Sequence, residues 1–264
     1  MAHKQAISST KKSTHPEPKA TESNVITAAT VKQNLPLIAA LTAEFIGTFL
    51  LIASVFTVQG QPLFVSFALI GILLVVSGST NVYLNPAMTI GALVTKKVGP
   101  LHAIGQIMAQ LLGAAAAYFA LTAFMAGTPA TSASTATTTH LFHAASITAG
   151  KEWYIFFAEL LGSSILALGV SAALKAKDRI VAASTYGLAI LVAILIAGSA
   201  TAIYLTESNT TLTFLNPATA IAANAVTWGI WPIASYLIAP IIGAIIGFGL
   251  RDLLSSQKKD KQTV

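Results

Sequence analysis

The chain has no cysteine, and charged residues make up only 9% of its 264 residues. The lack of cysteine excludes disulfides, cysteine-ligated zinc and thiol nucleophiles. A typical soluble domain has about 25% charged residues, and this chain has far fewer. With 55% hydrophobic residues and a mean hydropathy of +0.74, the composition is that of a membrane protein.

The net charge of +6 does not indicate nucleic-acid binding. The basic residues lie in the tails and between apolar runs, with no aromatic residues interleaved. Nucleic-acid binding requires clustered basic patches, which are absent from the sequence.

Apolar runs long enough to span a bilayer follow a polar start, and two shorter apolar segments lie between them. The short segments are Leu84–Val94 and Leu215–Val226. They must sit buried in protein or line water, because irregular backbone is not tolerated in lipid. We therefore expect an all-α membrane protein with six transmembrane helices and two re-entrant half-helices. The expected spans are 35–57, 63–80, 101–125, 153–174, 180–204 and 229–250.

The rest of the chain is expected to be tails and one long loop. Residues 1–34 are polar and predict a disordered tail, because they cannot bury enough apolar surface to offset their ordering entropy. They contain no compact apolar segment with a cleavage site, so no signal peptide is expected. The membrane domain covers 35–252, a second tail covers 253–264, and the Thr-, Ala- and Ser-rich loop 126–152 is expected to be flexible and not a site.

The basic residues predict the orientation. An even number of spans puts both tails on one side, and all but one of the 15 basic residues, Lys151, fall on that side. The positive-inside rule places both termini in the cytoplasm, and we expect the plasma membrane. The first half-helix then enters from the cytoplasm and the second from outside. Asn209 lies on the outer side in a glycosylation acceptor pattern, which often arises by chance.

The tripeptide Asn-Pro-Ala opens both short segments. Asn is a favoured N-cap, and Pro fits the first helical position because its missing N–H would have no partner there. A helix N-terminus carries partial positive charge and unpaired N–H groups. Two such ends facing one another at membrane depth would repel cations in a pore. The residues are Asn85, Pro86 and Ala87, and Asn216, Pro217 and Ala218.

Three motifs recur in the same order in the two halves, about 35–125 and 153–250. AEFIGTFLLI is similar to AELLGSSILA, LNPAMTIGALV to LNPATAIAANAV, and AQLLGAAAAY to APIIGAIIGF. Three spans per half is an odd number, so the second half must be inverted, and such repeats with broken helices indicate a pathway at their interface. Close helix crossing is expected at Gly47, Gly113, Gly162, Gly243 and Gly247.

Over about 35–252, the two Asn-Pro-Ala tripeptides, the AEF and AEL glutamates and the inverted six-span repeat resemble the aquaporin and glycerol-facilitator family. The resemblance implies a passive channel for water, assembled as a homotetramer with one pore per subunit. Small neutral solutes such as glycerol or urea are further candidates. It also implies that Asn85 and Asn216 donate hydrogen bonds to water at the pore centre. The Pro and Ala residues of both tripeptides would set the geometry of the helix starts.

Glu44 and Glu159 are the acidic residues well inside the spans. Ionisable groups at such depth are costly and are usually functional or paired, so a proton relay is one interpretation. The family resemblance implies instead that both glutamates brace the re-entrant loops. We favour bracing, because they recur at equivalent repeat positions without an intramembrane Lys, Arg or His.

The sequence departs from the family pattern at the outer filter. Family members usually have Arg after the second tripeptide, where this chain has Thr219, and the Asp of glycerol facilitators is replaced by Ala220. We expect a constriction of Thr hydroxyls and apolar side chains without fixed positive charge, wider or less polar than a strict water pore. The resemblance assigns to this filter Thr219, Thr213, Ile194 and, as alternatives for one position, Val65 and Phe67.

Other functional classes remain as alternatives. A non-conducting structural or adhesion protein could use the same scaffold with a plugged pore. An intramembrane enzyme is disfavoured, because there is no Cys and no His deep in a span to form a nucleophile–base pair. A coupled transporter would rest only on the two glutamates. The sequence indicates no cofactor and no metal site.

Mercury provides a first test. Family members with a Cys near the second tripeptide are blocked there by mercurials, and this chain has none. Mercuric chloride should leave the osmotic shrinkage rate of proteoliposomes that contain the protein unchanged. Inhibition at modest mercury concentration would contradict the inference.

Overall fold

The computed structural model describes residues 22–77, 81–126, 141–205 and 210–260. Its contacts form two units, Met1–Pro36 and Leu37–Val264. Helix α1 (Glu22–Thr57) contributes to both. The helix begins at Glu22, inside the stretch 1–34 for which a disordered tail is predicted. Between Glu22 and Pro36 the chain has no Gly or Pro, and its alanines favour a helix.

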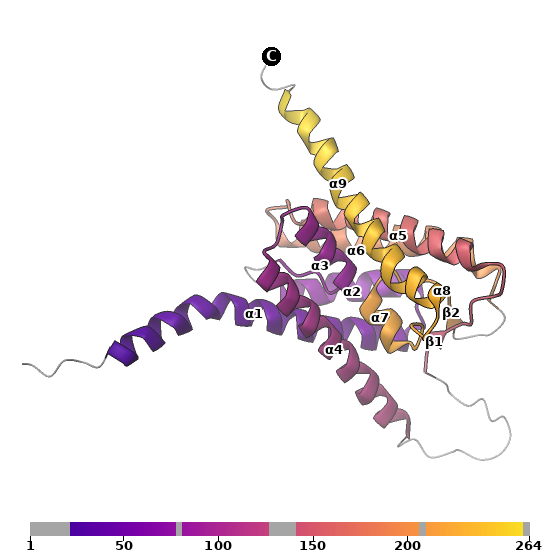
Figure 1. Cartoon of the computed structure of the whole chain (residues 1–264), viewed down its shortest axis with the longest axis horizontal. Coiled ribbons are helices and arrows are strands. Elements are labelled where there is room, and N and C mark those ends of the chain that lie inside the picture. The colour runs from indigo at the N-terminus through magenta and orange to yellow at the C-terminus, as the bar shows by residue number, and fades with distance from the viewer. Residues whose placement is uncertain (1–21, 78–80, 127–140, 206–209, 261–264) are drawn as a thin grey trace, which may run out of the picture. The chain divides into compact units, whose positions relative to one another are not determined.

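The unit Leu37–Val264 is helical apart from one pair of two-residue strands in its described residues, as expected for an all-α fold (Figure 1). Strand β1 (His143–Ala144) pairs in parallel with β2 (Thr210–Thr211). The remaining helices are α2 (Pro62–Val76), α3 (Pro86–Val94), α4 (Pro100–Ala126), α5 (Glu152–Ala173), α6 (Arg179–Ala202), α7 (Pro217–Ala222), α8 (Ile230–Ile233), the π-helical turn η1 (Ala234–Ile238) and α9 (Ala239–Asp260).

Five described stretches are long and apolar enough to cross a membrane, whereas six were expected. The exception is α2, with 15 residues, because a full span requires about 20. The predicted span 63–80 was too long, since the helix ends at Val76 and Ser77 is extended. Ser77 opens a Ser-Gly-Ser-Thr-Asn run, and Ser and Asn compete with helical hydrogen bonds. The five stretches are Leu37–Thr57, Pro100–Phe124, Glu152–Ala173, Arg179–Ala202 and Ile230–Ser256.

Both predicted half-helices are present. Helix α3 has nine residues and α7 has six, and each begins at the Pro of its tripeptide. The residue before each Asn has a left-handed backbone, with φ of 54° at Leu84 and 57° at Leu215. This conformation is uncommon for a residue other than glycine. It reverses the chain at the point where an extended segment turns into a short helix.

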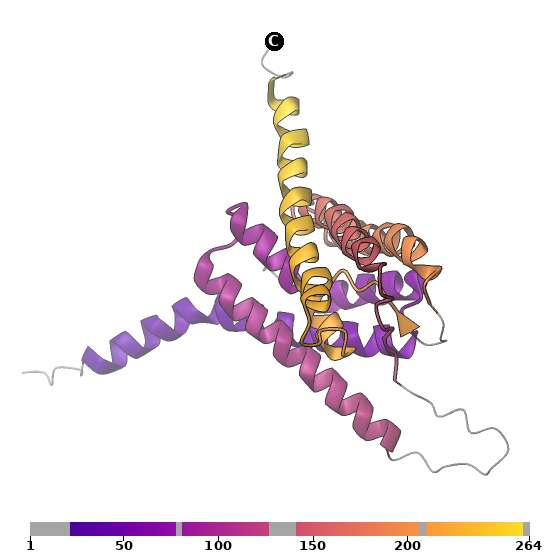
Figure 2. The ribbon, with the colours of Figure 1, turned by 45° about the vertical axis from the view of Figure 1, so that its right-hand side comes forward.

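The same close contact holds each half together. A Cβ atom added at Gly113 would lie 2.4 Å from the carbonyl oxygen of Phe45, and one added at Gly243 would lie 2.4 Å from that of Leu160. Phe45 and Leu160 directly follow Glu44 and Glu159 of the repeated motif. Helices α5 and α9, which meet at Gly243, lie side by side in Figure 1 and Figure 2. The predicted close crossing is confirmed at Gly113, Gly243 and Gly247, whereas Gly47 and Gly162 lie closest to the side chains of Leu84 and Leu215. The internal repeat thus extends to backbone packing.

Polar side chains are buried inside this unit beside its apolar core, and large apolar side chains also cover its surface. Glu44, Gln110 and Glu159 are fully buried, whereas Phe67 and Phe119 are more than half exposed. Such an exposed apolar surface is not typical of a soluble monomer. It fits a lipid-facing exterior around a core that holds the polar groups.

We predict that Gly243→Ala destabilises the protein by about 1–3 kcal/mol, because the added methyl group forces α5 and α9 apart. Thermal unfolding in detergent should show a lower midpoint. Gly249→Ala is the matched control on the same helix, since its added Cβ would meet nothing within 4 Å. This control should unfold at the wild-type temperature or above it. A Gly243→Ala variant as stable as wild type would contradict the close-crossing argument.

Candidate pore and its lining

The two Asn side chains join the two re-entrant segments. The Oδ1 atom of Asn85 accepts a hydrogen bond from the Ala87 N–H at 2.9 Å, and its Nδ2 atom donates to the Leu215 carbonyl at 2.8 Å. Asn216 repeats the pattern, with Oδ1 accepting from the Ala218 N–H at 3.0 Å and Nδ2 donating to the Leu84 carbonyl at 2.9 Å. Each side chain therefore caps its own helix and holds the backbone that precedes the other.

This exchange limits what each amide can offer to a solute. An Asn amide carries two N–H groups, and the cross-bond uses one of them. The donors predicted at the pore centre are thereby limited to one N–H per Asn. Each Asn can give one hydrogen bond to a passing molecule while the two segments stay joined.

Glu44 and Glu159 accept backbone N–H groups from the segments that precede the tripeptides. The Glu44 carboxylate accepts from Tyr83 at 2.7 Å and from Leu84 at 2.8 Å. It also accepts from the Gln110 side chain at 2.8 Å. The Glu159 carboxylate accepts from Phe214 and, at 2.8 Å, from Leu215. Both glutamates thus give partners to buried N–H donors. Each such donor left without a partner would cost about 1–3 kcal/mol of stability.

Four of the five residues predicted for the outer filter line one cavity of about 50 Å³, here called the Thr219 cavity. Asn216 also lines it. Phe67 does not, because its side chain is 64% exposed on the surface of α2. Its alternative, Val65, is 1% exposed and lies in the wall. The predicted residues brought together are Val65, Ile194, Thr213 and Thr219.

The wall of the Thr219 cavity is apolar with a few hydroxyls, and no charged side chain lines it among the described residues. The Thr213 and Thr201 hydroxyls lie 2.8 Å apart, which ties this part of the wall to α6. The Thr213 N–H donates to the Thr211 hydroxyl at 3.1 Å. The hydroxyl of Thr213 is therefore held in place before any solute arrives.

Phe142 also lines the Thr219 cavity, although no sequence prediction placed it there. It belongs to the loop 126–152, which was not expected to contribute to a site. Its ring packs edge-on against Phe56, with centroids 5.9 Å apart, and against Gly60. An added Cβ at Gly60 would lie 2.7 Å from this ring. An aromatic residue at the end of a Thr- and Ala-rich run was the available signal. The acceptor pattern at Asn209 and the loop residues 127–140 lie outside the described residues.

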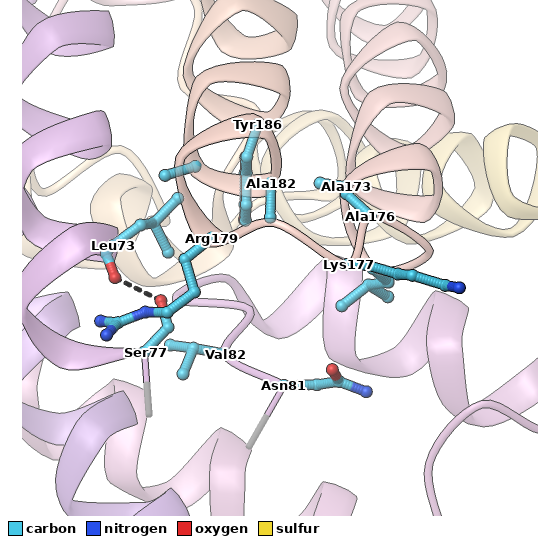
Figure 3. A pocket seen from close by; sticks show the side chains of 12 residues that line it. Leu73, Ser77, Asn81, Val82, Ala173, Ala176, Lys177, Arg179, Ala182 and Tyr186 are labelled. Atoms are coloured by element: carbon cyan, nitrogen blue, oxygen red, sulfur yellow. Dashed lines mark hydrogen bonds between the residues drawn. The ribbon is translucent and has the colours of Figure 1, made fainter. Parts of the chain in front are cut away.

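A second cavity, of about 210 Å³, lies beside the ends of α2 and α5 and the start of α6, and is here called the Tyr186 cavity (Figure 3). No sequence prediction concerned it. Lys177 and Arg179 give it a basic rim, and the Arg179 guanidinium donates to the Leu74 carbonyl at 2.7 Å. The backbone leading to Asn85 reaches it through Asn81 and Val82. The Thr219 cavity thus reaches Asn216 itself, whereas the Tyr186 cavity reaches Val82, three residues before Asn85.

Known proteins of similar sequence and structure agree with this architecture. Residues 60–250 match the model of the family described as major intrinsic protein. A stretch of 92 residues is 35% identical to the glycerol uptake facilitator protein-like 6 of Lactiplantibacillus plantarum. It covers 31% of this chain and 42% of that protein, so the chain matches less than half the length of this curated relative.

The fold is also similar to a solved structure, the X-ray structure of the aquaglyceroporin from Plasmodium falciparum. The TM-score is 0.59 at 20% identity, over 82% of this chain and 96% of that one. At this identity the similarity concerns the fold.

We predict that Glu159→Gln lowers stability. The amide keeps the size of the carboxylate, but its nitrogen cannot accept, so the buried N–H of Phe214 or Leu215 loses its partner at a cost of about 1–3 kcal/mol. The thermal unfolding midpoint in detergent should fall. Glu152→Gln, at the partly exposed start of the same helix, is the control and should unfold like wild type. Equal midpoints for all three proteins would show that the Glu159 bonds add no stability.

Proposed function

The chain belongs to the major intrinsic protein family, and from this premise we propose that it is a passive membrane channel for water that also admits small neutral solutes such as glycerol or urea. Proteins of this family are channels and not enzymes. One observation carries the proposal. Two Asn-capped half-helices are cross-bonded inside an apolar helical unit; one cavity is lined by Asn216 and another by Val82, three residues before Asn85.

The two helix starts support exclusion of cations. The cross-bonds between Asn85 and Leu215 and between Asn216 and Leu84 hold the N-terminal ends of α3 and α7 close together. Each end carries partial positive charge. A monovalent cation would meet both ends at once, whereas a neutral molecule could accept the remaining N–H of each Asn. We assign Asn85 and Asn216 the role of central donors, and Glu44 and Glu159 the role of braces.

The Thr219 cavity supports passage of neutral solutes beside water. Its apolar wall includes Val65, Ile194 and Phe142, which suit the CH groups of a polyol, while Thr213, Thr219 and Asn216 suit its hydroxyls. A fixed cation in this wall would hold water and narrow the passage. With Thr at position 219, selectivity rests on width and on hydroxyl placement.

The described basic residues support the proposed orientation, with both termini in the cytoplasm of a plasma-membrane protein. Lys97 and Lys175 both contact Asp252 near the end of α9, at 2.5 Å and 3.4 Å. They join the loops after α3 and α5 to that end. Basic loops gathered at one end are typical of the cytoplasmic side. We further propose a homotetramer, in which the exposed apolar faces are shared between lipid and neighbouring subunits.

A non-conducting structural or adhesion role on the same scaffold is the alternative, and it is not favoured. It would leave the two cavities and the buried Asn donors without a purpose.

Liposome swelling and shrinkage test the proposal. Purified protein should speed shrinkage in sucrose, which reports water, and swelling in glycerol or urea, which reports solute. Thr219→Arg should reduce solute flux at least about tenfold relative to water flux, because a large cation fills a cavity of about 50 Å³. Thr219→Val is the matched control of similar shape and should keep most of both fluxes. If wild type adds nothing to either rate, the protein is not a channel.

A further inference from the structure

The Thr219 cavity and the Tyr186 cavity share no lining residue. Along α6, Tyr186 lines one and Ile190, a single helical turn further on, lines the other. The two cavities are therefore separate, and Tyr186 and Ile190 lie where they approach one another along α6. Tyr186 is the largest side chain at this point, and it is only 5% exposed.

The Tyr186 hydroxyl donates a hydrogen bond to the carbonyl of Tyr83. Tyr83 lies on the extended backbone directly between Val82, which lines the Tyr186 cavity, and the Leu84–Asn85 turn. Carbonyls of such extended backbone are the acceptors that a pore offers to water. Tyr186 occupies one of them, so its hydroxyl takes the place that a water molecule would need.

The Tyr186 bond is not what holds this backbone in place. The Glu44 carboxylate already binds the N–H groups of Tyr83 and Leu84, and the Asn216 amide binds the Leu84 carbonyl. Three bonds to buried groups fix the segment without Tyr186. The hydroxyl is thus available to break its bond while the pore wall stays intact.

The helix that carries Tyr186 is fixed against α2. The Ser66 hydroxyl donates to the carbonyl of Gly187 at 2.6 Å, and a Cβ added at Gly187 would lie 2.2 Å from Ile70. This close packing keeps α6 from moving away from the passage. The ring can leave the passage only by rotation of its own side chain, and the adjoining cavity of about 210 Å³ gives it space (Figure 3).

We propose that Tyr186 is the residue that limits permeation through this pore, with its ring closing the passage between the two cavities and its hydroxyl latched to the Tyr83 carbonyl. The proposal rests on the proposed channel function. Each opening then requires one hydrogen bond to break and one ring to rotate into the Tyr186 cavity. Water flux is set by this step and not by the Thr219 cavity.

Two substitutions separate the latch from the ring. Tyr186→Phe removes the hydroxyl and keeps the ring, and it should raise water permeability per channel about fivefold, the equivalent of one net hydrogen bond of about 1 kcal/mol. Tyr186→Ile removes the ring as well and should raise it more than about tenfold. Tyr118→Phe and Tyr118→Ile, on α4 and in neither cavity, are the matched controls and should conduct like wild type. The readout is shrinkage of proteoliposomes in sucrose, per amount of folded protein by size-exclusion chromatography.

The outcomes separate this inference from the channel proposal. If wild-type flux exceeds that of protein-free liposomes and the folded Tyr186 variants conduct like wild type, Tyr186 does not limit permeation. The channel proposal would still stand. Lower flux per folded channel with a lower unfolding midpoint would make Tyr186 a structural anchor and would also overturn its role in limiting permeation. Background flux from wild type would overturn the channel proposal, and the role of Tyr186 in limiting permeation, which rests on that proposal, would fall with it. If Tyr186→Ile does not fold, the water permeability of Tyr186→Phe, which keeps the ring, still tests whether the hydroxyl limits permeation.

Discussion

Extended backbone inside a membrane has no water to satisfy its N–H and C=O groups, and this one constraint determines most of the structure. The chain runs extended at two such places, before Asn85 and before Asn216. At each, a fully buried glutamate accepts hydrogen bonds from two consecutive backbone N–H groups. An Asn from the other half donates to the carbonyl of the Leu at which the chain turns. The same bonds that satisfy the backbone also place both helix starts together. A polar centre with partial positive charge is thus a direct result of pairing the buried groups.

The close helix contacts follow from the same arrangement. The helices that carry the glutamates must lie near the re-entrant segments, and Gly47 and Gly162 leave room for the side chains of Leu84 and Leu215. Gly113 and Gly243 then bring the third helix of each half against the backbone just after the glutamate. The halves are not identical, since Gln110 adds a third bond to Glu44 and also bonds Thr89.

Repetition made much of the fold predictable. The Asn-Pro-Ala starts, the paired glutamates and the glycines are readable because each occurs twice in the same order, and local rules for helix capping give their geometry. The choice between Val65 and Phe67 was not readable. The two positions are about 200° apart around a helix, but α2 is apolar on all sides and offers no periodicity to set its inward face. The places of Phe142 and Tyr186 depend on contacts between residues far apart in the sequence, which local patterns do not reveal. The cross-bonds were missed because they join residues 130 and 132 positions apart.

That separation has a consequence for biosynthesis. When the first half of the chain has entered the membrane, the Leu84 carbonyl and the amide of Asn85 still lack their native partners, which lie more than a hundred residues downstream and have not yet been synthesised. The first re-entrant segment cannot take its final form until the second arrives. Folding of the two halves is therefore one late, joint event, and a ribosome that stalls in the second half leaves behind a nascent chain with unpaired polar backbone in lipid, a ready substrate for quality control.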